Sequence, residues 1–174
     1  MKKQSSLLLI LMLLLVLAGC GAKSAPSEPP ELTVTNAQGA SITAMGGSYD
    51  WDYEAGGGQR TGAIACGMHP LDETLRDSTP ALEMPIAVSA SFYYTVTLDF
   101  GDCAPDSVTL RYWNEQCWGD TQATAEKLTV QRQDDGTYTV ELIPSVGIFE
   151  VDAQWDTEDY CGRAFYSFCT KAAE

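Results

Sequence analysis

The chain has 174 residues, of which 24 are Asp or Glu and 10 are Lys or Arg, so its formal net charge at pH 7 is −14. Nucleic-acid binding relies on cationic side chains that meet phosphates, and this charge excludes nucleic acid as an expected partner. It favours cations, basic peptides or basic proteins instead.

Residues 1–19 predict a lipoprotein signal peptide. Lys2 and Lys3 precede an apolar run over residues 7–18, which is shorter than the roughly 20 residues of a membrane-spanning helix and typical of an export signal. The run ends in Leu17-Ala18-Gly19-Cys20, which resembles the lipobox of bacterial prolipoproteins. The resemblance implies cleavage before Cys20, a lipid anchor on the Cys20 thiol, and a place on the extracytoplasmic face of a bacterial cell membrane. An ordinary secretory signal is the alternative.

Cleavage would remove two of the ten basic residues and no acidic residue, which brings the formal charge to −16. Residues 20–31 then comprise the lipidated Cys20 and a segment of small, polar and proline residues. This composition predicts a flexible tether that reaches up to roughly 30 Å when extended. From residue 32 to residue 174 the composition is that of one globular domain.

The domain has the period-two alternation of β-strands, which predicts half-buried antiparallel sheets. The clearest runs are 92–100, 108–112, 128–130, 138–142, 149–155 and 164–169, and weaker ones are 32–36, 41–44 and 49–54. Asp135-Gly136 between two such runs predicts a hairpin. We therefore expect an all-β fold, a single antiparallel immunoglobulin-like β-sandwich of about seven to nine strands.

The long stretch 56–85 is rich in Gly and Pro and is predicted to be an irregular loop, with a short turn near residues 71–76. Long loops of this kind often carry function. We therefore expect any functional end of the domain to include it.

Five cysteines follow Cys20, and in an exported domain they predict disulfides, with one thiol left over because the number is odd. They are Cys66, Cys103, Cys117, Cys161 and Cys169. Sequence leaves 15 connectivities open, and a loop-to-loop bridge between Cys117 and Cys161 is a reasonable one.

Cys66 and His69 lie three residues apart in the long loop. This spacing raises two alternative hypotheses, a structural zinc site and a nucleophilic dyad. Structural zinc commonly takes two close ligand pairs, and only this pair is present, so we expect no metal site. A nucleophilic Cys66–His69 dyad needs a third group that orients the base, and no residue is identified for that role. We accordingly expect no catalytic residue and no cofactor. Asp50, Asp52 and Glu54 are interpreted as the solvent face of a strand.

Aromatic residues supply the candidate binding site. Trp51 and Trp155 fall on the inward faces of their strands and are expected in the core. Trp113 lies off the apolar face of its strand and Trp118 lies in a loop, so these two with Tyr93 are the candidates for an exposed ligand-binding patch.

Several segments together resemble small uncharacterised lipoproteins of gut Firmicutes. They are His69-Pro70-Leu71-Asp72, the octapeptide at 106–113, Trp118-Gly119-Asp120, Gly136-Thr137-Tyr138 and the nonapeptide at 147–155. The resemblance implies an immunoglobulin-like sandwich at the cell surface, and it identifies no catalytic residue. We expect a non-catalytic binding or accessory module for an envelope protein, peptide or glycan. The alternatives are an envelope enzyme or thiol-redox protein that uses the Cys66/His69 loop, and a purely structural surface protein.

Overall fold

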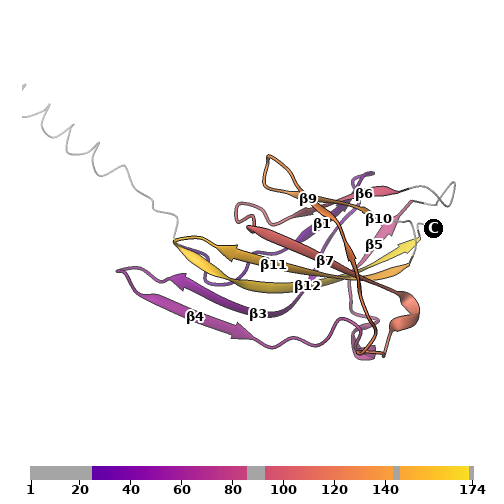
Figure 1. Ribbon diagram of the computed structural model, residues 1–174, viewed down its shortest axis with the longest axis horizontal. Coiled ribbons are helices and arrows are strands. Elements are labelled where there is room, and N and C mark those ends of the chain that lie inside the picture. The colour runs from indigo at the N-terminus through magenta and orange to yellow at the C-terminus, as the bar shows by residue number, and fades with distance from the viewer. Residues whose placement is uncertain (1–24, 86–92, 143–145, 173–174) are drawn as a thin grey trace, which may run out of the picture.

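The computed structural model describes residues 25–85, 93–142 and 146–172, and this part of the chain is almost entirely β-structure (Figure 1). Twelve strands and two 3-10 helices form it: β1 (Thr33–Asn36), β2 (Ser41–Thr43), β3 (Met45–Glu54), β4 (Arg60–Ala65), η1 (Glu73–Leu75), β5 (Ala81–Met84), β6 (Tyr94–Asp99), β7 (Ser107–Asn114), η2 (Glu115–Cys117), β8 (Glu126–Leu128), β9 (Val130–Arg132), β10 (Tyr138–Leu142), β11 (Gly147–Asp156) and β12 (Tyr160–Ala172). None of the helices within these ranges is long and apolar enough to cross a bilayer.

The strands form two sheets. Sheet A has the order β2-β1-β6-β10-β9, and sheet B has the order β4-β3-β12-β11-β7-β8, with β5 paired to β12. Every pairing is antiparallel except that of β5 with β12. The predicted all-β antiparallel sandwich is confirmed, although the described residues contain twelve strands and not seven to nine.

The predicted hairpin at Asp135-Gly136 joins β9 to β10, with Tyr138 opposite Arg132. Gly136 has a φ of 88°, a left-handed conformation that glycine adopts without steric cost. The Asp135 carboxylate accepts hydrogen bonds from the Thr137 amide at 3.0 Å and from the Thr137 hydroxyl at 2.7 Å. Turn chemistry of this kind fixes the register of the two strands.

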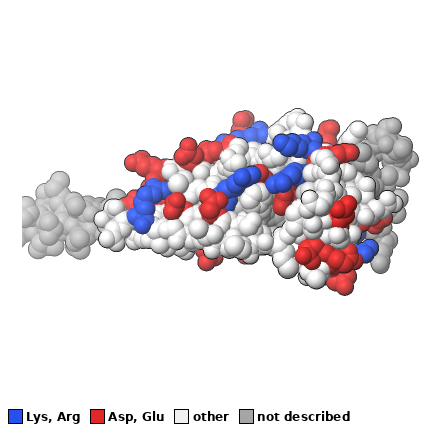
Figure 2. All heavy atoms as spheres, turned by 60° about the horizontal axis from the view of Figure 1, so that its bottom comes forward, with Lys and Arg blue, Asp and Glu red and all other residues white. Residues whose placement is uncertain are grey.

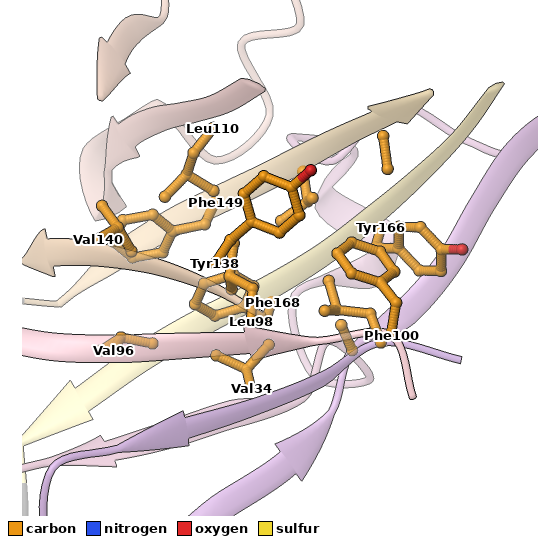
Figure 3. Close-up of a cluster of buried hydrophobic side chains, with 14 of the residues drawn as sticks. Val34, Val96, Leu98, Phe100, Leu110, Tyr138, Val140, Phe149, Tyr166 and Phe168 are labelled. Carbon is orange, nitrogen blue, oxygen red and sulfur yellow. The ribbon is translucent and has the colours of Figure 1, made fainter. Parts of the chain in front are cut away.

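The core lies between the sheets (Figure 3). Sheet A contributes Val34, Val96, Leu98 and Val140, and sheet B contributes Leu110, Phe149, Val151, Tyr166 and Phe168, all of them buried. These are the alternating apolar positions of their strands, and each fully buried side chain of this size contributes about 1.5–3 kcal/mol. Trp51 and Trp155 also lie in this core, as predicted, and their rings meet edge to face at 5.2 Å.

Two predictions about the strands were wrong in detail. The stretch 56–85 contains β4 and β5 in addition to η1. β4 lies at the edge of sheet B and is mostly exposed, so it has little apolar alternation to detect. The run 128–130 is divided between the sheets, because Leu128 pairs with Leu110 in sheet B while Val130 pairs with Val140 in sheet A.

The sandwich has two distinct ends. The turn between β11 and β12 lies at one end, with the tip of the β3–β4 hairpin, and we call this the turn end (Figure 1). The C-terminal part of β12 and the segment after β7 lie at the other end, which we call the loop end. Gly147 and Asp156 mark the two ends of β11 and lie about 30 Å apart at roughly 3.3 Å per residue.

Candidate functional site

A hollow with apolar walls lies at the loop end, where the chain crosses from sheet B to sheet A after β8. It has a volume of about 230 Å³, and we call it the Tyr93 hollow. Its lining residues are Tyr93, Tyr112, Glu126, Leu128, Glu141, Leu142 and Phe149. The crossing at residues 128–130 opens it, because β8 continues sheet B while β9 belongs to sheet A.

The walls of the Tyr93 hollow are held by the core behind them. Phe149 is 2% exposed and stacks on Phe168 at 4.9 Å between ring centroids. Tyr112 contacts Phe149 from the neighbouring strand, at 5.2 Å between ring centroids. Tyr93, by contrast, is 57% exposed. The hollow therefore combines a rigid aromatic floor with one solvent-facing aromatic side chain.

The rim of the hollow is acidic. Glu126 and Glu141 are both exposed, and the described lining residues include no Lys or Arg. A second, more polar hollow of about 420 Å³ adjoins the first and shares Tyr93, Leu128 and Glu141 with it. An aromatic surface beside carboxylates attracts a cation both through the ring faces and through charge.

The structure does not bring the three predicted ligand-binding aromatics together. Trp113 is 4% exposed and donates its indole N–H to the Ala123 carbonyl at 3.0 Å, so its prediction as part of an exposed patch was wrong. Trp118 is half-buried and packs against the same small cluster as Trp113, on the outer face of sheet B. Tyr93 lines the hollow, where neither tryptophan is found.

A covering segment explains the burial of Trp113. Leu71 is fully buried against Trp113 and Ile148, and its carbonyl accepts a hydrogen bond from the Gly119 amide at 2.8 Å. Two segments, the one around Leu71 and the one around Gly119, thus lie over this part of the sheet. Strand alternation identifies the face on which Trp113 lies, but it does not reveal that the long loop covers this face.

The predicted disulfides are not formed in the structure, where all five cysteines of the described ranges are free thiols. The bridge between Cys117 and Cys161 is ruled out by position. Cys161 pairs with Asp156 at the turn end, and Cys117 follows β7 at the loop end, in η2. The two ends are about 30 Å apart, whereas a disulfide needs Cα atoms within about 7 Å.

The environments of the thiols differ. Cys66 is exposed, whereas Cys169 packs against the Trp113 cluster, and burial raises the pKa of the Cys169 thiol to about 11. Cys161 Sγ accepts a hydrogen bond from Arg60 Nη2 at 3.2 Å. The neutral thiol is a poor nucleophile, so burial makes Cys169 unreactive.

The His69 side chain contacts neighbouring residues of the fold. Its Nδ1 accepts a hydrogen bond from the Leu71 amide at 3.2 Å, and its ring lies edge-on to Trp113 at 6.0 Å. Burial, and next the positive charge of Arg111, lower the pKa of His69. Within the described ranges there is no group of three or more His, Cys, Asp and Glu residues that would hold a metal ion.

A charged network lies on the outer face of sheet B. Asp152 accepts two hydrogen bonds from Arg163, and Arg111 lies 2.9 Å from Glu150 and 3.8 Å from Asp152. Both guanidinium groups lie over the ring of Phe165. Figure 2 shows one face of the molecule on which basic and acidic side chains are interspersed along the middle, with a group of mostly acidic side chains at the lower right. Because its charges are paired, we interpret this network as part of the sheet's architecture.

Of the lining residues of the hollow, sequence reasoning identified only Tyr93 as a binding candidate and missed the other six: Tyr112, Glu126, Leu128, Glu141, Leu142 and Phe149. Tyr112 and Phe149 follow the apolar alternation of core residues, and only their place at the open end of the sheets puts them in the wall of the hollow. Comparison of the chain with protein-family models, curated proteins and solved structures gives no match.

Proposed function

We propose that the protein is a lipid-anchored, non-catalytic binding module on the extracytoplasmic face of a bacterial cell membrane, and that the Tyr93 hollow holds a basic side chain of an envelope protein or peptide. The lipobox-like sequence ending in Cys20 supports the location. The observation that carries the binding role is the hollow itself, with aromatic walls and two carboxylates at its rim.

The size of the hollow supports a single side chain as its occupant. Pockets for whole small molecules have volumes of roughly 300–1,000 Å³, and this one has about 230 Å³. A lysine side chain offers an apolar stem for Leu128, Leu142 and Phe149 and an ammonium group for the glutamates. A cation over a tyrosine ring contributes about 0.5–2 kcal/mol, depending on its desolvation.

The alternative of thiol chemistry in the Cys66/His69 loop is less well supported. His69 directs Nδ1 to the Leu71 amide, and no hydrogen bond links Cys66 to His69 among the interactions of the described residues. A nucleophile and its base need to be within hydrogen-bond reach. A purely structural surface role does not account for an acidic aromatic hollow.

The test is the affinity of the mature chain for two acetylated, amidated tripeptides, Gly-Lys-Gly and Gly-norleucine-Gly. Norleucine keeps the apolar stem and lacks the ammonium group. We expect millimolar binding of the lysine peptide, weakened up to about fivefold in Glu141→Gln, because an ionic contact near a surface is worth up to about 1 kcal/mol. The control variant Glu115→Gln makes the same charge change on an exposed residue outside the hollow, and it should bind as the wild type does. Equal binding of both peptides would contradict cation recognition, and no binding of either would contradict the binding role of the hollow.

A further inference from the structure

The chain before β1 is bound to the domain. Trp51 donates its indole N–H to the Pro26 carbonyl at 2.8 Å, and Tyr166 donates its hydroxyl to the Pro30 carbonyl at 2.7 Å. Leu32, directly after this segment, is fully buried. The expectation of a flexible tether through residue 31 was therefore wrong for its second half, which we call the bound segment (residues 26–31).

The bound segment lies along a groove of about 300 Å³ that runs over β3 and β12. The groove is lined on the domain side by Tyr49, Ala164, Phe165, Tyr166 and the glycines Gly46 and Gly47. Proline-rich chain favours an extended conformation whose carbonyls have no internal partners, so aromatic N–H and O–H donors hold it at low entropic cost. Pro26, Pro29 and Pro30 supply that preference in this chain.

The two donors are themselves fixed. The ring of Trp51 stacks on Tyr160 at 5.3 Å and meets Trp155 at 5.2 Å between ring centroids, so its N–H has a set direction. Tyr166 is 5% exposed and meets Phe100 at 5.7 Å. Burial raises the pKa of the Tyr166 hydroxyl, which remains a neutral donor at every physiological pH.

From these contacts we infer that the bound segment is a fixed stalk that orients the domain on the membrane, with the turn end toward the bilayer and the Tyr93 hollow away from it. The inference rests on the proposed lipidation of Cys20. Only residues 21–25 would then separate the lipidated residue from the stalk, a span of at most roughly 18 Å.

The positions of the two sites along one strand give the orientation. Trp155, which contacts Trp51, and Phe149, which lines the hollow, belong to β11 and lie about 20 Å apart at roughly 3.3 Å per residue. The segment runs from Trp51 near the turn end toward Tyr166 and then into β1. In Figure 1 the described part of the chain likewise begins near the turn end, while β12 ends at the other.

The charges at the turn end bear on the height of the domain above the bilayer. The connection between β11 and β12 carries Glu158 and Asp159, both exposed, next to the exposed Asp156. Such a surface is repelled by anionic headgroups, and the domain should stand on its stalk without lying flat. The hollow is thereby presented to partners in the envelope and withheld from ligands embedded in the same bilayer.

The first test is cleavage of the mature chain by a Glu-specific protease at Glu31, which is exposed, is followed by Leu32 and lies within the bound segment. The double variant Trp51→Phe/Tyr166→Phe removes both donors and keeps an aromatic ring at each position. The matched control is Trp113→Phe/Tyr138→Phe, since Trp113 donates to the Ala123 carbonyl at 3.0 Å and Tyr138 to the Pro105 carbonyl at 2.6 Å, away from the segment.

We expect cleavage at Glu31 to be about tenfold faster or more in Trp51→Phe/Tyr166→Phe, because proteolysis follows the population of the released segment. The control should be cleaved there at the wild-type rate. Wild-type cleavage as fast as that of Trp51→Phe/Tyr166→Phe would overturn the inference. This result depends on no ligand, so it is independent of whether the hollow binds a lysine peptide.

The second test measures orientation with the lipidated protein in liposomes. A donor fluorophore is placed at Glu158→Cys or at Glu115→Cys, each with Cys66→Ser, and the acceptor is on the lipid headgroups. We expect stronger energy transfer from position 158 than from position 115, and loss of this difference when Trp51→Phe/Tyr166→Phe is added. Equal transfer from the two positions in the protein with an intact stalk would overturn the orientation.

Discussion

Asp152 on β11 and Arg163 on β12 form a two-pronged ion pair across the outer face of sheet B, with Nε to Oδ1 at 2.7 Å and Nη2 to Oδ2 at 2.5 Å. Asp152 is only 8% exposed, and Arg111 approaches it from the other side. The pair lies diagonally across the sheet, because Arg163 is in register with Gln154 and Asp152 with Phe165. A carboxylate this enclosed depends on both guanidinium groups to balance its negative charge.

Replacing this carboxylate should therefore destabilise the fold. We expect Asp152→Asn to lower the free energy of unfolding by about 1–3 kcal/mol, because it removes the charge that pairs with two partly buried arginines. Chemical denaturation measures this loss. Asp156→Asn, an exposed carboxylate of the same strand, should change stability by about 0.5 kcal/mol or less. Equal effects of the two substitutions would show that the network adds nothing to stability.

The stability of the β9–β10 turn should depend on pH, and the direction of this dependence follows from the pKa of Asp135. The hydroxyl and then the amide of Thr137 lower the pKa of Asp135 below its ordinary value. A lowered folded-state pKa means that the turn is stabilised above the ordinary pKa of Asp and that this contribution disappears as the pH falls through the folded-state value.

The carboxyl chemical shift of Asp135 followed against pH tests this prediction. Thr137→Val removes the hydroxyl and keeps the amide, so the pKa of Asp135 should rise part of the way to its ordinary value. The unchanged Asp72, whose pKa is also lowered by a threonine hydroxyl, that of Thr74, serves as the internal reference. An Asp135 pKa that is the same in both proteins would rule out the hydroxyl as the cause.

Alkylation should distinguish the thiols. At pH 8 the native protein should react first at the exposed Cys66, whereas Cys169, with a pKa of about 11, has only about a thousandth of its thiol ionised. Unfolding without a reductant should expose all five thiols, as counted by mass spectrometry. A mass that lacks two alkyl groups per protein would establish a disulfide and restore the expectation drawn from the sequence.

Substitutions in the Tyr93 hollow should affect either the stability of the fold or the binding of the lysine peptide, depending on whether the side chain is buried or exposed. Phe149→Ala removes a buried core ring and should cost about 3–5 kcal/mol of unfolding free energy. Tyr93→Ala, at an exposed side chain, should cost about 0.5 kcal/mol or less yet abolish measurable binding of the lysine peptide. Thermal denaturation and titration of the same samples provide both readouts. A strongly destabilised Tyr93→Ala variant would place Tyr93 in the fold and not in a binding surface.

Period-two alternation predicted the long strands well because each of them buries one face. β7, β10, β11 and β12 each contain a predicted run, and β6 lies within the run at 92–100, whose first residue is outside the described residues. β5 was not predicted, because it is short and lies between Pro80 and Pro85. Only its pairing with the end of β12 identifies it as a strand.

The candidate site was less accessible to sequence reasoning. Tyr93 was identified, but its neighbours Leu128 and Phe149 come from distant parts of the chain and meet only after the sheets are packed. The bound segment was missed for a similar reason: its contacts with Trp51 and Tyr166 use backbone carbonyls, which no side-chain pattern records.

The most direct test of the binding account is a map of the lysine peptide's site by NMR on the isotopically labelled mature chain. The account predicts that acetylated, amidated Gly-Lys-Gly shifts the resonances of Tyr93, Tyr112, Glu141 and Phe149, and that the norleucine peptide leaves them unchanged. Shifts confined to other surfaces, or the same shifts with norleucine, would contradict the claim that the Tyr93 hollow recognises a basic side chain.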